Sequence, residues 1–415
     1  MVKFFIQNVG IGIIILSLIL LPIPTCSISY IGTYNQVNAD NKLVIYTYEY
    51  FFGLTNETLS GGVYDKIFTS FENRYGVDID IRFFSGARNI FLTALQEYKA
   101  GVRTADLLIG IDNIVVQEAK KAGILVKINE TDLQNLSRID SDLIDNFDPD
   151  LYAVPYDFSP IAFIYDTQRI NLTELKFEDF YNQTLASYLV IEDPTLSTTG
   201  VSFLLWQIGV YEKILEKDWK EWWSKIKDNI IVTKSWGEAY YSYFLNEQEG
   251  RPIVVSYLTS PVYHGLYENT TRYRPMLVKY NDRWYSWFQI QGIGIVKGSP
   301  MVDMALKFID WLLSDEVQSL VAENDIMLPA STDILNSLPE NIKQYLVYNI
   351  SEIEPVNNLV SVQEVYNNID TWLSEWQEVM TAGPSMLPLY MISLVATVAI
   401  IGVLYMFYRR KRVKM

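Results

Sequence analysis

The chain of 415 residues has a single cysteine, Cys26, and a single histidine, His264. One cysteine excludes an intramolecular disulfide framework, and one histidine leaves little scope for a histidine-rich metal site. The sequence also lacks the Gly-x-Ser-x-Gly elbow of many hydrolases. A surface hydrolase that uses His264 with an aspartate and a serine is therefore the least favoured alternative, and we expect no enzyme activity, no metal and no cofactor.

Basic residues are scarce relative to acidic ones. Lysine and arginine number 33 against 49 aspartates and glutamates, which gives a formal net charge of −16. Proteins that bind nucleic acids need stripes of positive charge to contact the phosphates. The composition therefore excludes a nucleic-acid partner and is compatible with a cationic ligand.

Long apolar runs occur only at the two ends of the chain. Lys3 precedes the apolar run 11–21, which predicts that residues 1–28 are a signal peptide or an N-terminal anchor. Residues 387–407 are long and apolar enough to cross a bilayer, and the basic segment 408–415 places the tail in the cytoplasm. We therefore expect a body on the extracytoplasmic face of the cell membrane, anchored by one C-terminal helix.

Asn-x-Ser/Thr sequons support this location, because such motifs accept glycans on exposed loops of exported proteins. The predicted body would then be a glycoprotein. The seven candidate asparagines are Asn56, Asn129, Asn135, Asn171, Asn182, Asn269 and Asn349.

Aromatic residues make up 14% of the chain and gather in the stretch 232–264. Rings beside serine, threonine and proline at a strand end are typical of a flat-walled ligand pocket. The alternative for each ring is packing in the core, where aromatics are common. Both interpretations stay open at this stage, and for Tyr241 and Tyr243 we favour the core.

Apolar periodicity predicts alternating strands and helices in the first part of the body. Such alternation indicates an α/β fold with a mostly parallel sheet, whose ligands lie beyond the carboxyl ends of the strands. Asp112 follows one of these strands. The predicted strands are 43–48, 77–84 and 105–111, and the predicted helices are 62–75, 88–100 and 113–122.

From residue 151 onward the pattern changes. The segments 152–166 and 289–296 are predicted to be extended crossings between two lobes. A strand at 189–194 leads into the Ser/Thr/Gly loop 195–200, which opens the predicted helix 201–215. Such a loop is either an anion site or an ordinary helix cap. Trp219, Trp223 and Ile226 share one helical face and are predicted to pack in the core.

Taken together, these blocks resemble the periplasmic thiamine-binding proteins of ABC importers. The resemblance covers about 43–379, and its blocks keep the same order along the chain. They are Tyr46-Thr47-Tyr48, Ala105 to Asn113, Val154-Pro155-Tyr156-Asp157, Glu192-Asp193-Pro194 with Ser197-Thr198-Thr199-Gly200, Leu204-Leu205-Trp206, Val232 to Tyr240, Ser256 to His264, and Leu373 to Gln377.

The resemblance implies a two-lobed type II periplasmic-binding-protein fold with hinge crossings. Lobe 1 would comprise 41–156 and 290–381, and lobe 2 would comprise 157–289. The implied protein is a monomeric, non-enzymatic subunit that binds thiamine or a thiamine phosphate and delivers it to a permease and its ATPase. The alternative within this fold is another solute, such as iron(III), a polyamine or an oxyanion.

The resemblance also implies site residues. By position, the pocket walls are Tyr48, Trp236, Tyr257 and Tyr263. The loop residues Ser197, Thr198 and Gly200 would lie at the alcohol or phosphate end of the ligand. Asp112 or Asp157 would complement its charge or its amino group. The chemistry is consistent, because a ring face attracts a desolvated cation by roughly 0.5–2 kcal/mol.

Two positions depart from the family pattern. Ile326 stands where the family places a tryptophan before a Met-x-Pro motif. Shortly after Tyr48, where the family has another tryptophan, this chain has only Phe51, Phe52 and Leu54. The ligand is therefore less firmly implied than the fold.

Overall fold

In the computed structural model, residues 41–102, 104–248 and 250–382 are described. All of them belong to one compact unit that begins at Asn41. The predicted signal peptide or anchor (1–28), the predicted membrane helix (387–407) and the basic tail (408–415) lie outside these ranges. Within the described ranges, the helices are too short or too polar to cross a membrane.

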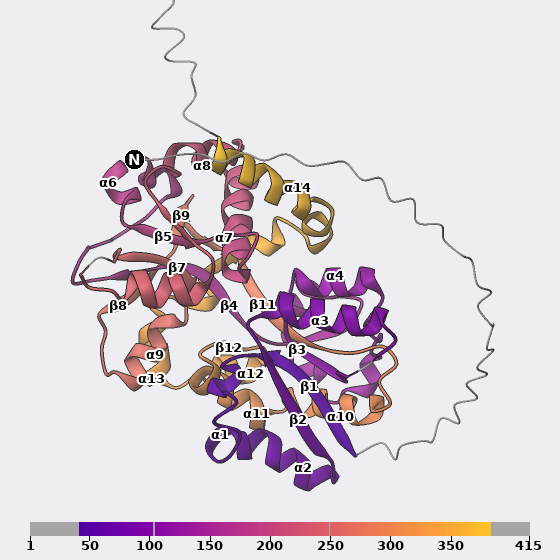
Figure 1. Cartoon of the computed structure of the whole chain (residues 1–415). Coiled ribbons are helices and arrows are strands. Elements are labelled where there is room, and N and C mark those ends of the chain that lie inside the picture. The colour runs from indigo at the N-terminus through magenta and orange to yellow at the C-terminus, as the bar shows by residue number, and fades with distance from the viewer. Residues whose placement is uncertain (1–40, 103, 249, 383–415) are drawn as a thin grey trace, which may run out of the picture. The chain divides into compact units, whose positions relative to one another are not determined.

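A ten-stranded sheet runs through the body (Figure 1). Strands β8 (Tyr273–Met276) and β12 (Leu328–Pro329) join it by pairing with β4. A second sheet has the order β13 (Ile353–Pro355), β10 (Arg283–Ser286) and β9 (Val278–Tyr280). The main order is β2 (Asp78–Phe84), β1 (Lys42–Tyr48), β3 (Leu107–Asp112), β11 (Phe288–Ile295), β4 (Ala153–Asp166), β7 (Ile253–Tyr257), β5 (Leu189–Glu192) and β6 (Ile231–Thr233).

The strand directions correct the expectation of a mostly parallel sheet. Parallel pairing holds for β1 with β2 and β3, and for β5 with β6 and β7. Every pair made by β4 or β11 is antiparallel. The reason is that these two strands are the crossings, which traverse the sheet in opposite directions. The rest of the fold is the expected mixture of helices and strands.

Strand β4 confirms the first extended segment, and β11 confirms the second. All 14 residues of β4 are buried. Its first half pairs with β11 as far as Pro160, and its second half pairs with β7 from Ile161 onward. One continuous strand therefore serves two sets of neighbours, with the change of partner in its middle.

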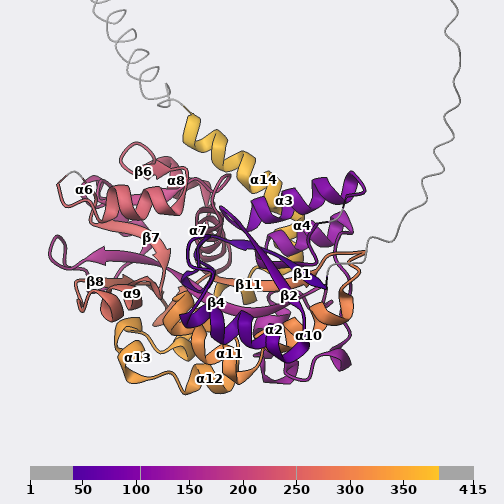
Figure 2. The same cartoon turned by 60° about the horizontal axis from the view of Figure 1, so that its bottom comes forward.

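Two groups of elements lie on either side of this change (Figures 1 and 2). The first group contains β1–β3 with α1–α4 and α10–α12, and the second contains β5–β8 with α6–α9. The helices are α1 (Gly62–Tyr64), α2 (Ser70–Tyr75), α3 (Ala87–Lys99), α4 (Val115–Ala122), α5 (Ser141–Asp145), α6 (Gln183–Ala186), α7 (Thr198–Gly209), α8 (Lys220–Ile226), α9 (Ser260–Tyr267), α10 (Val302–Leu312), α11 (Asp315–Leu320), α12 (Thr332–Asn336), α13 (Glu340–Leu346) and α14 (Val362–Thr381).

Shorter 3-10 and π segments connect or extend these helices. The π segment η2 joins α1 to α2, so the predicted helix 62–75 is one helical run. The segments are η1 (Phe51–Gly53), η2 (Asp65–Thr69), η3 (Glu130–Asp132), η4 (Leu136–Arg138), η5 (Phe177–Tyr181), η6 (Val210–Ile214), η7 (Glu238–Phe244), η8 (Val321–Asp325), η9 (Ile350–Glu352) and η10 (Val356–Asn358).

The core of the second group is built from aromatic rings. Trp219, Trp223 and Ile226 are buried there, as their shared helical face predicts. The Trp223 ring lies edge-on to Trp222 at 4.8 Å between centroids, and Trp222 lies edge-on to Phe177 at 5.3 Å. Edge-to-face contacts of this kind add to the free energy of burying large rings.

Helix α14 packs on both groups. Its Trp376 ring lies edge-on to Trp223 of α8 at 5.8 Å, and Lys121 of α4 lies 5.0 Å from the Tyr366 ring centroid. From the sequence this helix was assigned to lobe 1 alone. The lobe boundaries remain a prediction, but α14 does not belong to one side only.

The seven sequon asparagines differ in exposure. Six are exposed, and Asn135 is half-buried. The Asn135 side-chain amide donates to the Asp310 carbonyl oxygen at 2.9 Å. Asn135 is therefore the least accessible of the predicted glycan sites.

Candidate ligand-binding site

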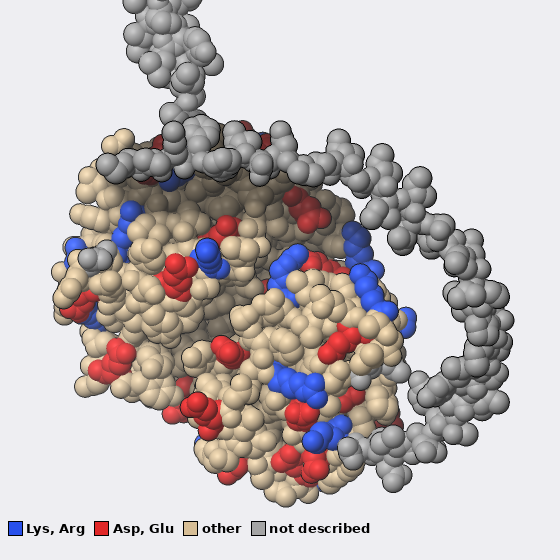
Figure 3. All heavy atoms as spheres, viewed as in Figure 1, with Lys and Arg blue, Asp and Glu red and all other residues tan. Residues whose placement is uncertain are grey.

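The surface is hollowed where the two groups meet (Figure 3). Four strands end near this cleft at residues that bear functional side chains: β1 at Tyr48, β3 at Asp112, β5 at Glu192 and β7 at Tyr257. Tyr48 and Tyr257 lie deep in the molecule and are nevertheless only partly buried. Deep side chains that remain open to solvent are expected at the wall of a ligand cleft.

On the first group's side, Tyr48 lies in a hydrogen-bonded network. Its hydroxyl donates to the Asp325 carboxylate, with oxygen–oxygen distances of 3.0 and 3.1 Å, and lies 3.3 Å from the Tyr156 hydroxyl. The Phe52 backbone N–H also donates to Asp325 at 2.9 Å. Tyr156 in turn donates to Gln291 Oε1 at 3.1 Å. Tyr48 is thus held in place before any ligand arrives.

Asp157 lies beside this network with its side chain fully buried. Burial and the nearby Asp325 raise the pKa of Asp157 well above its usual range. Burial also raises the pKa of Asp325, to about 6, while its hydrogen bonds from Phe52 and Tyr48 oppose the increase. Apart from the Asp325 carboxyl, the Asp157 oxygens have no hydrogen-bond partner among the described residues. A proton shared between the two carboxyls accounts for this arrangement, since two adjacent buried carboxylates cannot both be charged.

Asp112 lies at the junction of the two groups. Its Oδ1 accepts from the N–H groups of Ile114 and Val115 at 2.9 and 2.8 Å, so it caps the start of α4. Burial raises the pKa of Asp112, and the hydrogen bonds from the Val115 and Ile114 N–H groups, with the nearby Thr198 side chain, oppose that rise. Thr198 begins α7 in the second group. Asp112 and Thr198 therefore join the two sides across the cleft.

The loop before α7 is shaped by close packing. A Cβ at Gly200 would lie 2.7 Å from the Glu192 carbonyl oxygen, so only glycine fits there. The Ser197 and Thr199 hydroxyls are 2.9 Å apart and bond to each other. The predicted anion loop is thus also a tight turn that requires glycine at position 200.

Trp236 and Tyr257 lie on the second group's side. Trp236 Nε1 donates to Ser256 Oγ at 2.7 Å, and its ring stacks on Tyr240 at 4.9 Å between centroids. Gln289 Nε2 donates to the Tyr257 hydroxyl at 2.9 Å. Burial raises the pKa of Tyr257, and the nearby Asp112, Glu192 and Asp157 raise it further. Three carboxyl groups therefore lie near the Tyr257 phenol.

Tyr263 lies at the rim of the cleft rather than at its floor. Its side chain is 46% exposed, and its ring packs against Tyr267 at 5.2 Å. Tyr241 is 60% exposed, which contradicts our assignment of this ring to the core. Its pKa is raised by burial and by the adjacent Tyr263 and Tyr50. Because Tyr50 follows β1, rings from both groups meet at the rim.

The two departures from the family pattern have clear structural places. Phe51 and Phe52 are buried, and the Phe51 ring lies edge-on to Tyr48 at 5.7 Å, so these rings support a wall rather than form one. Ile326 is partly buried and adopts φ 57°, a left-handed conformation that isoleucine rarely takes. It directly follows Asp325, whose position this turn helps to fix.

The sequence interpretation missed Glu192 and Asp325 as site residues. Glu192 is fully buried at the end of β5, and neither carboxyl oxygen has a hydrogen-bond partner among the described residues. Burial raises its pKa to about 8. Its place at the carboxyl end of a strand was visible in the sequence, whereas the contact of Asp325 with Tyr48, 277 residues away, was not.

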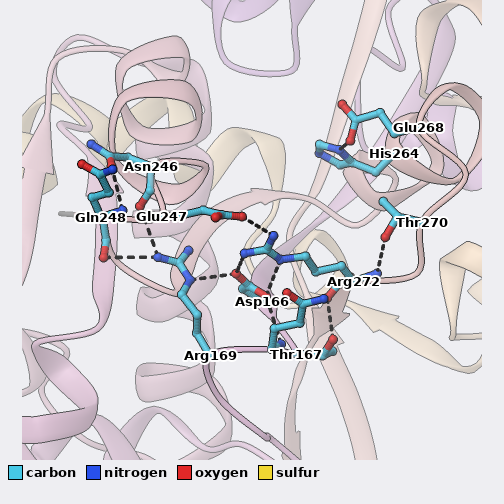
Figure 4. Close-up of polar contacts among 12 residues, drawn as sticks. Asp166, Thr167, Arg169, Asn246, Glu247, Gln248, His264, Glu268, Thr270 and Arg272 are labelled. Atoms are coloured by element: carbon cyan, nitrogen blue, oxygen red, sulfur yellow. Dashed lines mark hydrogen bonds and ion pairs between the residues drawn. The ribbon is translucent and has the colours of Figure 1, made fainter.

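His264 has partners that do not suit a hydrolase. Its Nδ1 lies 2.7 Å from Glu268 Oε2 (Figure 4). Its Nε2 lies 2.9 Å from the hydroxyl of the buried Tyr240. The same view shows the buried Asp166 held by Arg169 and Arg272, at 2.7 and 2.6 Å. These contacts leave no serine nucleophile on His264 within the described part of the chain, so the histidine has a packing role.

Comparisons with known proteins identify the family of this chain. The family model for bacterial extracellular solute-binding proteins matches residues 66–346. A thiamine-binding periplasmic protein of Brucella abortus is 26% identical over 354 residues, which cover 83% of this chain and 94% of that protein. The thiamine-binding periplasmic protein of Escherichia coli K12 is 26% identical over 282 residues, covering 67% of this chain and 77% of that protein.

Solved structures show the same fold. A periplasmic thiamin binding protein matches with a TM-score of 0.66 at 23% identity, covering 82% of this chain and 96% of that one. A ferric binding protein from Campylobacter jejuni matches with a TM-score of 0.63 at 18% identity, covering 81% and 99%. Since the family model spans most of the body, the chain belongs to the bacterial extracellular solute-binding proteins.

Proposed function

We propose that this chain is the solute-binding subunit of an ABC importer and that it binds thiamine or a thiamine phosphate between its two groups of elements. The observation that carries the proposal is the meeting of aromatic rings and carboxyls in one cleft. Tyr48, Trp236 and Tyr257 are its rings, and Asp112 and Asp157 lie among them. Thiamine combines a planar aminopyrimidine with a permanently charged thiazolium, and this pairing matches both features.

Each part of the cleft has a role in this proposal. The Trp236 face, supported from behind by Tyr240, would stack on a ring of the ligand. Tyr257 and the nearby carboxyls would complement the cation and the amino group. Thr198 and Ser197 would meet the hydroxyethyl end. Tyr263, at the rim, would cover the ligand when the cleft closes. No bond is made or broken, so binding needs only capture and release.

Closure would use the crossing strands. The lobes of the proposal are residues 41–156 with 290–381, and residues 157–289. The pairing partner of β4 changes near Pro160. A change of backbone conformation there would move one group against the other, while each group keeps its own strand pairs. The predicted segment 387–407 would anchor this body at the outer face of the membrane beside its permease.

Titration of the purified full chain with thiamine tests the proposal, with tryptophan fluorescence as the readout. We expect saturation with a dissociation constant of about 1 μM or below, equivalent to about −8 kcal/mol or stronger. Ferric citrate and spermidine serve as matched controls and should raise the melting temperature less than thiamine does. A fluorescence signal that does not saturate below about 1 mM thiamine would contradict the proposal.

A further inference from the structure

His264 connects an exposed carboxylate with the interior of the second group. Its Nδ1 bonds to Glu268 at 2.7 Å (Figure 4), and its Nε2 bonds to the hydroxyl of the buried Tyr240 at 2.9 Å. A carboxylate can only accept, so Nδ1 carries the hydrogen, and in the neutral ring Nε2 is then the acceptor. The Tyr240 hydroxyl therefore donates its one hydrogen to His264, and its oxygen can accept a further bond.

A second set of hydrogen bonds holds Trp236. Its Nε1–H donates to the buried Ser256 Oγ at 2.7 Å, and the Ser256 and Ser260 hydroxyls are 2.8 Å apart. The Ser260 side chain also lies near the Tyr240 phenol. When Tyr240 accepts from Ser260, Ser260 can accept from Ser256, and each hydroxyl hydrogen is used once. The bonds then run in one direction, from the Trp236 indole toward His264.

The rings of Trp236 and Tyr240 join the two sets directly. They stack with 4.9 Å between centroids and 24° between their planes. A stack on one face and a hydrogen bond at one edge restrain the indole in different directions, so both side-chain torsions of Trp236 are held. Trp236 is only partly buried, so the restrained ring still has exposed surface.

The sequence brings these groups together through a spacing of four residues. Ser260, His264 and Glu268 follow one another at this spacing along α9 and its C-cap. Trp236 and Tyr240 have the same spacing in the helical run that continues as η7. Side chains four residues apart lie on the same side of a helix. One side of α9 therefore meets one side of the η7 run.

A residue that only filled space at position 264 would need no polar atoms. An apolar side chain there would leave the buried Tyr240 hydroxyl without its acceptor, and the hydroxyl would turn toward Ser260. Ser260 would then donate to Ser256, so the Ser256 hydrogen would lose its acceptor beside the Trp236 N–H. The disturbance would thus reach the Trp236 ring through hydrogen bonds rather than through a change of volume.

We propose that His264 is a positioning residue for the ligand: with Glu268 and Tyr240, it fixes the plane of the Trp236 ring before the ligand binds. The inference rests on the proposed function, in which Trp236 stacks on the ligand, and deepens it. A ring that is already oriented loses little conformational freedom on binding, so more of the stacking free energy is retained as affinity. His264 acts through Trp236 and needs no contact with the ligand.

The test is calorimetric titration of the full chain with thiamine, well below the melting temperature of each variant. His264→Leu should bind about tenfold more weakly than the wild type, equivalent to about 1.4 kcal/mol. His264→Gln should recover most of this loss, because its amide oxygen can accept from Tyr240 and its amide nitrogen can donate to Glu268. A purely structural role would change the melting temperature of His264→Leu and leave its dissociation constant unchanged.

Tyr345→Phe is the matched control. The Tyr345 hydroxyl donates to the Gly265 carbonyl oxygen of α9 at 3.2 Å, so this variant removes a hydrogen bond from the same helix at a different place. We expect a lower melting temperature and an unchanged dissociation constant for thiamine.

The indole N–H signal of Trp236 in an NMR spectrum of the isotope-labelled chain gives a readout that needs no ligand. The chain has ten tryptophans, and the signal that disappears in Trp236→Phe is the one to follow. His264→Leu should shift this signal, whereas His264→Gln and Tyr345→Phe should leave it near its wild-type position.

Wild-type affinity in a folded His264→Leu chain would overturn the inference, and so would a His264→Gln chain that binds as weakly as His264→Leu. If the wild-type chain does not bind thiamine, the proposed function fails, whereas a shifted Trp236 signal in His264→Leu still supports the positioning role. If His264→Leu does not fold, Glu268→Ala at the exposed end decides the question. Binding about threefold weaker than the wild type would support the inference, and unchanged binding would overturn it.

Discussion

The two sides of the cleft satisfy their polar groups in different ways. On the first side, Asp325 accepts hydrogen bonds from Tyr48 and Phe52 within the protein. On the second side, Glu192 accepts none from another described residue. A group with internal partners stabilises the fold, whereas a buried group without partners gains most from a ligand. We therefore expect the hydrogen-bonded network around Asp325 to be the more rigid wall, and Glu192 to gain more from a ligand.

The largest expected effect concerns pH and Glu192. Its pKa of about 8 is raised from an ordinary value of 4.5, so the folded chain keeps a proton that the unfolded chain has lost between these values. The free energy of unfolding should therefore fall as pH rises through this window, by roughly 5 kcal/mol in total at about 1.4 kcal/mol per unit. Urea unfolding of the ligand-free chain at several pH values measures this slope.

Glu192→Gln provides the control for that slope. It should remove the Glu192 contribution to the slope between about pH 4.5 and 8, and leave the contributions of Asp325 and of its neighbour Asp157, whose pKa values are also raised. If the variant loses stability above pH 6 as steeply as the wild type, Glu192 is not the cause of the pH dependence of the free energy of unfolding.

Trp236→Ala should have the next largest effect. Loss of the ring removes a stacking surface on the second side, and we expect thiamine affinity to fall roughly 100-fold, equivalent to about 3 kcal/mol. Calorimetric titration measures the change. Trp284→Ala, on β10 of the smaller sheet, is the matched control and should bind as the wild type. Unchanged affinity in Trp236→Ala would place the ligand elsewhere.

Asp325→Ala tests the first side. The substitution leaves the Tyr48 hydroxyl and the Phe52 N–H without their acceptor, so the free energy of unfolding should fall by about 2 kcal/mol at pH 7. Asp325→Asn, which keeps one oxygen acceptor, should lose less. If both variants were as stable as the wild type but failed to bind thiamine, the first side would also be a recognition surface, and the contrast between the sides would fail.

The smallest expected effect is at the rim. Tyr241→Ala removes an exposed ring that lies edge-on to Trp236 at 5.6 Å, and we expect affinity to fall only about threefold to fivefold. Tyr98→Ala on α3 is the control. A loss as large as that of Trp236→Ala would mean that the rim rings close directly on the ligand.

The sequence predicted the parts of this site that depend on local pattern. Strand ends are visible in apolar periodicity, so Asp112 could be placed after a strand in advance, whereas Tyr48 and Tyr257 were assigned to the pocket by the family resemblance. Side-chain exposure could not be predicted in this way, because it depends on which face of a helix other elements cover. Tyr241 was therefore wrongly assigned to the core. The Tyr48–Asp325 bond was also beyond prediction, since nothing local links residues so far apart. The antiparallel pairing of β4 and β11 likewise follows from long-range topology.

The attachment of helix α14 determines how a force on the C-terminal end of the body would be transmitted. Lys227 Nζ donates to the Val379 carbonyl oxygen at 2.9 Å, and Lys220 pairs with Glu375 at 3.3 Å, so the end of α14 is fastened to the second group. Its contacts with the first group include the cation–π pair of Lys121 and Tyr366. A pull on the chain beyond residue 382 would therefore load the second group first. A chain held through this end would keep the second group in place while the first group moves, as the proposed closure requires.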